Sequence, residues 1–326
     1  MAGTLITISS NSWLGMWMGL EINLLSIIPL MTDSNNPRAS ESSLKYFITQ
    51  ALASIIVLTS IMMMNTQTWM NNNLASIDTP DMLMVTSLLL KTGAAPFHFW
   101  FPEVVEGSTW INALILLTWQ KIAPMMMLMY NKLPILMAMA IMASITVGSI
   151  MGLNQTSLRK ILSFSSINHI GWMLAIVLFA EKIWILYFTT YLAMNSMLIW
   201  LFSLLKTSHL NQLLTNIQTN PSLKAFFMMN FLSLGGTPPF VGFLPKWLTI
   251  QSLVANQMYM MSFLLIIAAL ITLYYYLRIA LSTMIFSAPL TSMINKMSNL
   301  KKKNLIMMNS FILTSLILYI ATFSMI

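Results

Sequence analysis

The chain has 326 residues, of which 57% are hydrophobic and only 7% are charged, and its mean hydropathy is +0.77. Soluble domains carry about 25% charged residues, so this composition excludes a soluble globular fold and predicts a polytopic helical membrane protein. The formal net charge is +8, but the basic residues lie beside apolar segments, which indicates a topology signal and no nucleic-acid partner. The absence of cysteine excludes disulfides, thiolate-held iron–sulfur clusters and cysteine-attached haem.

Apolar segments long enough to cross a bilayer, about 20 residues each, predict an all-α bundle of eleven transmembrane helices. The first, Met1–Ser9, is too short as written. Turn-forming stretches such as Asp33–Pro37 and Asp78–Asp81 separate the helices. The other ten predicted helices are Ser12–Met31, Leu44–Met64, Met82–Phe101, Ser108–Tyr130, Leu133–Met151, Ile161–Ala180, Ile183–Leu205, Lys224–Val254, Met258–Phe286 and Leu305–Ile326.

The basic residues of the loops fall mostly on one side of the membrane when alternate loops are placed on opposite sides. Ten lie on one side and two on the other, which predicts that the N-terminus is on the positive side and the C-terminus on the opposite side. The same bias favours one broken crossing over Lys224–Val254, because two full crossings would move the last basic loop to the other side. The ten are Arg38, Lys45, Arg159, Lys160, Lys206, Lys224, Lys296, Lys301, Lys302 and Lys303, and the two are Lys132 and Lys182.

Two of the predicted helices contain the same pattern, G-x-x-P-F-x-x-x-x-P followed by a charge. It runs from Gly93 to Glu103 and again, 143 residues later, from Gly236 to Lys246. Five crossings separate the two copies, so they cross the bilayer in opposite directions, as in inverted-topology repeats whose broken helices meet near the midplane. The pattern predicts repeat units 1–131 and 132–286 and an added helix 305–326 within one transmembrane domain. Chance similarity of two glycine- and proline-rich breaks is the alternative. The predicted helix-breaking residues are Pro96, Pro124, Gly235, Pro238, Pro239 and Pro245.

Besides Arg278, which lies toward the positive-side end of its predicted helix, four charged residues lie inside the predicted spans: Glu21, Lys91, Lys121 and Lys246. A charge at that depth costs at least roughly 2.5–3.5 kcal/mol, and each lysine adjoins a proline break that frees a backbone carbonyl. By this rule Pro96 frees the carbonyl of Thr92. Desolvation favours the neutral form of each group, so a row of them joined by water predicts a proton relay. Snorkelling or salt-bridged residues are the alternative.

His98 and His169 are possible further members of the relay, because histidine titrates near neutral pH. Each is as well explained as a hydrogen-bonded packing residue. The sequence contains no cluster with metal-ligand spacing and no glycine-rich nucleotide loop, so we expect no redox active site and no bound metal or cofactor in this chain.

Several motifs carry a resemblance that spans most of the chain: GLEIN (19–23), LKTGAAPFHFW (90–100), LTWQKIAP (117–124), SINHIGWM (166–173) and LSLGGTPPFVGFLPKW (232–247). On these motifs the chain resembles the mitochondrially encoded NADH dehydrogenase (ubiquinone) subunit 2 family, the antiporter-like membrane subunits of respiratory complex I, and it looks most like the arthropod members. The family usually has further residues ahead of Gly3, which would complete the first helix, so packing at that edge is uncertain from the sequence.

The resemblance implies a proton-translocating subunit of NADH:ubiquinone oxidoreductase, with Glu21, Lys91, Lys121 and Lys246 on the proton path. It implies that NADH, FMN, iron–sulfur clusters and ubiquinone bind to other subunits. Expected partners are antiporter-like neighbours in the membrane arm, accessory subunits and lipids. The expected location is the mitochondrial inner membrane, with the N-terminus on the matrix side and the C-terminus in the intermembrane space. Two other functions stay open: a stand-alone cation/proton antiporter, and a structural membrane subunit without its own proton path.

Overall fold

The computed structural model describes residues 1–33, 36–70, 79–217 and 221–285. These residues form helices joined by turns, with one isolated β-bridge between Ser157 and His209, so the all-α prediction is confirmed for this part of the chain. The predicted eleventh helix, Leu305–Ile326, lies outside the described residues together with Lys296 and the lysines at 301–303. The count of eleven therefore stays a prediction.

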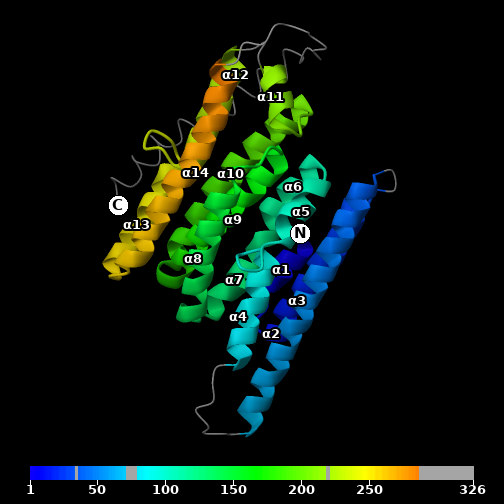
Figure 1. Cartoon of the computed structure of the whole chain (residues 1–326). Helices are drawn as coiled ribbons and strands as arrows, with labels where there is room; N and C mark the ends of the chain where they lie inside the picture. The colour runs from blue at the N-terminus through cyan, green and yellow to red at the C-terminus, as the bar shows by residue number, and fades with distance from the viewer. Residues whose placement is uncertain (34–35, 71–78, 218–220, 286–326) are drawn as a thin grey trace. The chain divides into compact units, whose positions relative to one another are not determined.

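The chain divides into two compact units. The first comprises residues 1–148 and 162–181, and the second comprises residues 149–161 and everything from Lys182 onward. Figure 1 labels the helices. The first unit holds α1 (Ala2–Ser9), α2 (Trp13–Met31), α3 (Pro37–Met70), α4 (Thr79–Thr92), α5 (Trp100–Gly107), α6 (Trp110–Leu117), the 3₁₀ helix η1 (Trp119–Lys121), α7 (Ile122–Tyr130), and most of α8 (Pro134–Met151) and α9 (Leu158–Phe179). The second unit holds nearly all of α10 (Glu181–Leu205), and α11 (Leu210–Ile217), α12 (Pro221–Gly235), α13 (Phe243–Ala255) and α14 (Tyr259–Ile285).

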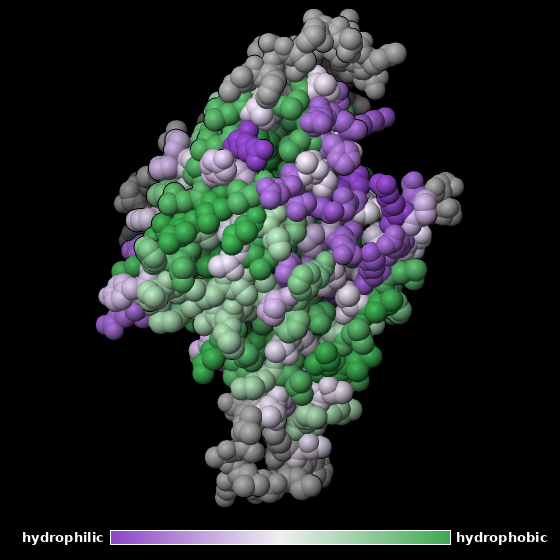
Figure 2. All heavy atoms as spheres, in the orientation of Figure 1, coloured by the Kyte–Doolittle hydropathy of each residue, from purple (hydrophilic) through white to green (hydrophobic). Residues whose placement is uncertain are grey.

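Seven helices of the described residues are long and apolar enough to cross a membrane. Large apolar side chains lie exposed along them, among them Leu25, Leu52 and Leu270, which are 55–62% exposed. Apolar residues cover much of the face shown in Figure 2. An apolar surface of this extent is suited to lipid rather than to water. The seven are Trp13–Met31, Pro37–Thr66, Trp110–Tyr130, Pro134–Met151, Leu158–Phe179, Glu181–Leu205 and Tyr259–Met284.

The short helix α1 lies against α2 through small residues. A Cβ atom placed on Gly19 would stand 2.7 Å from the carbonyl oxygen of Gly3 and 2.8 Å from the backbone nitrogen of Thr7. Thr4 and Thr7 are buried in the same region and turn their hydroxyls back onto the backbone of α1. Small residues let two membrane helices approach closely and gain van der Waals contact. The contact therefore fixes a helix that is too short to span alone.

Around this pair, α2 packs on α3, and α3 packs on both α4 and α5. Lys45 of α3 is bonded to Glu41 of its own helix and to Glu103 of α5, at 2.8 Å each. In the second unit, α12 and α13 both pack on α14. These contacts hold the two halves of each interrupted helix against a continuous neighbour.

Both segments with the glycine- and proline-rich pattern are interrupted. The helix α4 ends at Thr92 and α5 begins at Trp100, while α12 ends at Gly235 and α13 begins at Phe243. The two breaks thus lie at the same offset of 143 residues. The first residue of each break, Gly93 or Gly236, has a φ of +74° or +80°, a left-handed conformation that favours glycine.

Three expectations about helix ends require correction. The chain leaves α4 at Gly93, three residues before Pro96, so the glycine conformation and not the proline ends this helix. Pro245 lies in the first turn of α13, and Pro124 lies in the first turn of α7, where a missing backbone N–H costs no helical bond. The real interruption of the predicted helix Ser108–Tyr130 is at residues 118–121.

Two further differences concern length. The helix α3 extends well beyond the predicted Leu44–Met64, because Pro37 provides a preorganised first helical position and the polar flanks continue the helix. The stretch Lys206–Leu223, which falls between two predicted helices, contains α11, which buries Leu213 and leaves polar residues outside. Eight amphipathic residues are too few and too polar to be found by a search for membrane spans.

Gly19→Ala should separate α1 from α2, because the new methyl group meets backbone atoms that cannot rotate away. We expect a loss of about 1–3 kcal/mol in unfolding free energy, the usual cost of overpacking. Thermal unfolding of the purified protein in detergent measures it. Met18→Ala in the same helix is the matched control, because the Met18 side chain is 49% exposed. It should have little effect on the unfolding free energy. Equal stability of the two variants would contradict the close packing of α1.

Candidate functional site

Two of the predicted lysines lie buried at helix ends in the first unit. Lys91 stands in the last turn of α4 and is 7% exposed, and Lys121 is the last residue of η1 and is 1% exposed. The α4 helix ends there because Gly93 turns the chain. At η1 the backbone tightens, since Thr118 leaves helical geometry with ψ −75° and the Lys121 N–H donates to the Thr118 carbonyl at 3.2 Å. Mid-helix 3₁₀ turns of this kind often mark functional hinges.

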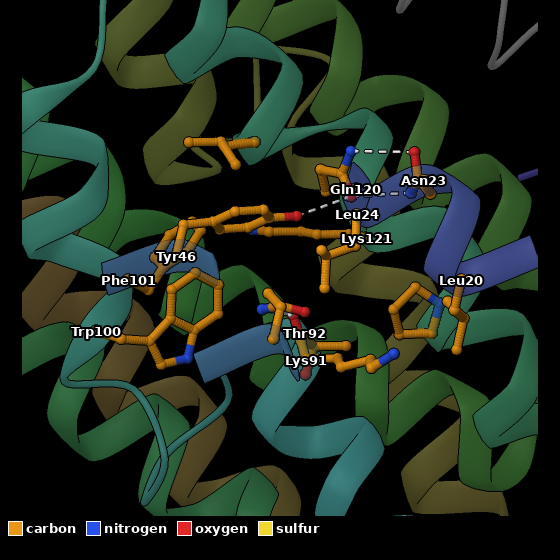
Figure 3. A pocket seen from close by; sticks show the side chains of 13 residues that line it. Leu20, Asn23, Leu24, Tyr46, Lys91, Thr92, Trp100, Phe101, Gln120 and Lys121 are labelled. Carbon is orange, nitrogen blue, oxygen red and sulfur yellow. Dashed lines mark hydrogen bonds between the residues drawn. The ribbon is translucent and has the colours of Figure 1, made fainter. Parts of the chain in front are cut away.

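Lys91 and Lys121 line the same cavity. It has about 20 Å³ of space for the centre of a water molecule, and about 10–15 Å³ is enough to hold one. Figure 3 shows the side chains around it. Polar groups make up a large share of the wall, so the cavity is suited to water. The lining residues are Leu20, Asn23, Leu24, Tyr46, Gln50, Lys91, Thr92, Trp100, Phe101, Leu116, Gln120, Lys121 and Pro124.

Three neutral side chains on the cavity wall are hydrogen-bonded to one another (Figure 3). Asn23 of α2 donates from Nδ2 to Gln120 Oε1 at 2.9 Å, and Gln120 donates from Nε2 back to Asn23 Oδ1 at 3.3 Å. The Tyr46 hydroxyl of α3 donates to the same Gln120 oxygen at 3.3 Å. We call Asn23, Tyr46 and Gln120 the amide–tyrosine network. It joins α2, α3 and η1 through side chains 74 to 97 residues apart in the sequence.

The amines of the two lysines leave the cavity in different directions. Lys121 places Nζ 5.2 Å from the ring centroid of Phe101, a cation–π distance. Lys91 extends toward Leu20 of α2 in Figure 3. Glu21, the neighbour of Leu20, is half-buried and acts on Lys91 electrostatically, although no ion pair within 4.0 Å joins them. The cavity that both lysines line has room for water.

Neutral donors take the carbonyls that the first break frees. The indole N–H of Trp100 donates to the Leu90 carbonyl at 3.2 Å, and Gln50 donates from Nε2 to the Lys91 carbonyl at 3.4 Å. Both donors also line the cavity. The Lys91 amine is therefore not required to satisfy the end of its own helix.

The second break is satisfied by a charged residue. Lys246 of α13 is 5% exposed and donates from Nζ to the carbonyls of Leu234 and Gly235, at 3.1 and 2.8 Å. Both carbonyls end α12, where the negative end of the helix dipole favours a cation. Lys246 belongs to the second unit, so its arrangement is described by itself.

Residues 10–272 match the transmembrane family described as NADH:quinone oxidoreductase/Mrp antiporter. The chain belongs to this family. Its similarity to NADH-ubiquinone oxidoreductase chain 2 of Anopheles gambiae is 52% identity over 283 residues, which is 86% of this chain and 82% of that protein. The same comparison with Xenopus laevis gives 42% over 296 residues, 88% of this chain and 84% of the relative. The resemblance drawn from the motifs is thereby confirmed.

Solved structures show the same fold. A chain of respiratory complex I from Thermus thermophilus with bound aureothin has a TM-score of 0.83 at 24% identity, covering 96% of this chain and 74% of that chain. A chain of the Mrp complex from Dietzia sp. DQ12-45-1b has a TM-score of 0.77 at 17% identity, covering 89% and 60%. At these identities the likeness establishes fold alone.

The fold brings together some of the predicted site residues and not others. Lys91, Lys121 and, at longer range, Glu21 converge in the first unit. His98 and His169 are both buried but do not line the cavity. His98 contacts the Pro96 carbonyl at 3.2 Å through Nδ1, which fits a packing role within the break.

The sequence reasoning did not single out Tyr46, Gln50 or the amide pair of Asn23 and Gln120. The motifs GLEIN and LTWQKIAP could have pointed to two of them, because they contain Asn23 and Gln120. Nothing in the sequence around Tyr46 marks it. In the part of the chain that the structure describes, no three metal-binding side chains lie together.

Neighbouring glycines at the second break should respond oppositely to the same substitution. Gly236→Ala puts a methyl group on a residue with φ +80°, 2.8 Å from Lys246 Cδ, and should cost about 1–2 kcal/mol of stability. Gly235→Ala meets nothing closer than 3.6 Å and should leave stability unchanged or raise it by up to about 1 kcal/mol. Thermal unfolding of the two purified variants measures the difference. Equal stability of Gly236→Ala and Gly235→Ala would contradict the left-handed conformation of Gly236.

Proposed function

We propose that this chain is the antiporter-like, proton-translocating membrane subunit of an NADH-ubiquinone oxidoreductase. In this role Glu21, Lys91, Lys121 and Lys246 relay protons, driven by redox chemistry in other subunits. NADH, FMN, iron–sulfur clusters and ubiquinone then bind elsewhere in the complex. Membrane-arm neighbours, accessory subunits and lipids surround this subunit.

The observation that carries the proposal is the cavity shared by Lys91 and Lys121. Two buried lysines on the wall of one polar, water-sized cavity are costly for a purely structural bundle. Water in the cavity would carry the proton between two amines that point apart.

The mechanism is a change in charge pairing. Glu21 is half-buried on α2 and acts electrostatically on Lys91. Protonating Glu21 removes its negative charge and so alters how strongly Lys91 holds its proton. Lys91 then exchanges with Lys121 across the cavity. Lys246, which binds carbonyls at the end of α12, is the third lysine of the path. The direction of transport decides whether it releases its proton first or last.

Two other functions make different predictions. A stand-alone cation/proton antiporter would run in liposomes on an ion gradient without redox partners. A purely structural subunit would lose assembly when its buried charges are removed but would keep full turnover in each assembled complex. We favour a relay over the structural role, because water in the polar cavity would connect the two lysines.

Lys121→Met and Glu21→Gln should lower the number of protons moved per electron in the assembled, reconstituted complex. Removing a positioned proton-transfer group costs on the order of 100-fold in the rate of its step. Proton uptake into liposomes, measured against NADH oxidation and normalised to assembled complex, reports it. Lys132→Met is the matched control, because Lys132 is paired with Glu181 near the surface. Unchanged stoichiometry in both relay variants would refute the proton path.

The proposed location is the mitochondrial inner membrane, with Lys206 on the matrix side and Lys182 on the intermembrane-space side. Since the chain has no cysteine, single cysteines report sidedness without background from this chain. Lys206→Cys should react with a membrane-impermeant thiol reagent only when the matrix side is accessible, and Lys182→Cys only from the outer side. Gel mobility of this chain after labelling measures both. Labelling of both positions from one side would overturn the predicted topology.

A further inference from the structure

We propose that Asn23, Tyr46 and Gln120, the amide–tyrosine network, position Lys121 for proton exchange with Lys91 across the cavity. The inference rests on the proposed function and names residues that act through Lys121 without carrying the proton themselves. It begins from three hydrogen bonds that converge on one side chain, Gln120.

Gln120 and Lys121 are consecutive residues of the same 3₁₀ turn, Trp119–Lys121. A 3₁₀ helix has three residues per turn, so neighbouring side chains point about 120° apart and one cannot rotate about the helix axis without the other. Holding the Gln120 side chain therefore holds the direction of Lys121. The turn needs such an anchor, because α6 ends before it and η1 itself has only three residues.

The anchor is attached at two other helices. Gln120 Oε1 accepts from Asn23 on α2 and from Tyr46 on α3, and Gln120 Nε2 donates back to Asn23. Asn23 and Tyr46 are 4% and 3% exposed, so both side chains are shielded from bulk solvent. Three hydrogen bonds from Gln120 to two other helices fix the turn more firmly than any one of them.

The chemistry of the network also suits a positioning role. Neither amide titrates near neutral pH, and the Tyr46 hydroxyl points its hydrogen at the Gln120 oxygen. The network consequently offers the proton no competing site. It leaves the lysine amines and water in the cavity as the groups that accept and release it.

The amines of the two lysines have different neighbours. Lys121 is steered toward Phe101 at 5.2 Å, while Lys91 extends toward α2. Because the amines diverge, a small rotation of η1 changes whether a single water can reach both. The network should therefore affect the rate of transfer more than the stability of the fold.

The experiment uses Gln120→Leu and Tyr46→Phe in the assembled complex reconstituted in liposomes. Proton movement per electron and NADH-driven turnover are both normalised to assembled complex and measured across pH. We expect Tyr46→Phe, which removes one hydrogen bond, to lower turnover about three- to tenfold. Gln120→Leu, which removes all three, should lower it further, and the pH profile should shift in both variants. Tyr275→Phe, at a buried tyrosine of α14 outside this cavity, is the matched control and should leave both unchanged.

A second background separates positioning from folding. In Lys121→Met complexes, Gln120→Leu should cause no further loss, because the network acts only through Lys121. An additional loss of similar size in that background, or an unshifted pH profile with normal turnover, would overturn the inference. If Lys121→Met alone left proton movement intact, the proposed function would fail first, and this outcome is distinct from a failure of the network alone.

Discussion

Hydrocarbon offers no hydrogen bonds, so every carbonyl released at a broken helix must find a donor within the protein. This constraint determines the surroundings of both breaks. At the first, Trp100 and Gln50 supply neutral donors to the last carbonyls of α4. At the second, Lys246 supplies a cationic donor to the last two carbonyls of α12. Each break begins with a glycine in the left-handed conformation, but the side chains that satisfy the released carbonyls differ.

The difference has a consequence for the lysine beside each break. Lys246 donates to two carbonyls, and these bonds orient its amine toward the end of α12. Lys91 follows the opposite arrangement, because neutral side chains serve the break and its amine extends toward α2 and Glu21. A lysine that is not occupied with the helix end is free to respond to a carboxylate several ångströms away. Trp100 and Gln50 thus serve the end of α4 in place of the Lys91 amine.

The sequence was sufficient for features that are local. Apolar runs located the helices, and the shared glycine–proline pattern located both interruptions, because a left-handed glycine and a run of prolines act within a few residues. It failed where the cause is distant. The turn at 118–121 precedes Pro124, the residue that was expected to break the helix, and its side-chain anchors lie 74 and 97 residues earlier. No local pattern contains that information, so neither the amide–tyrosine network nor the cavity could be inferred without the fold.

The repeat is best understood as a repeat of backbone and not of charge. In the 143-residue register, Lys246 corresponds to Glu103, and Lys91 corresponds to Leu234. Glu103 is exposed and bonded to Lys45 at 2.8 Å, whereas Lys246 is buried against carbonyls, so equivalent positions carry opposite charges in different surroundings. The pattern therefore specifies where carbonyls are released inside the bundle. Which side chain takes them differs between the two breaks. Neutral donors, Trp100 and Gln50, take the carbonyls at the first, and the charged amine of Lys246 takes those at the second.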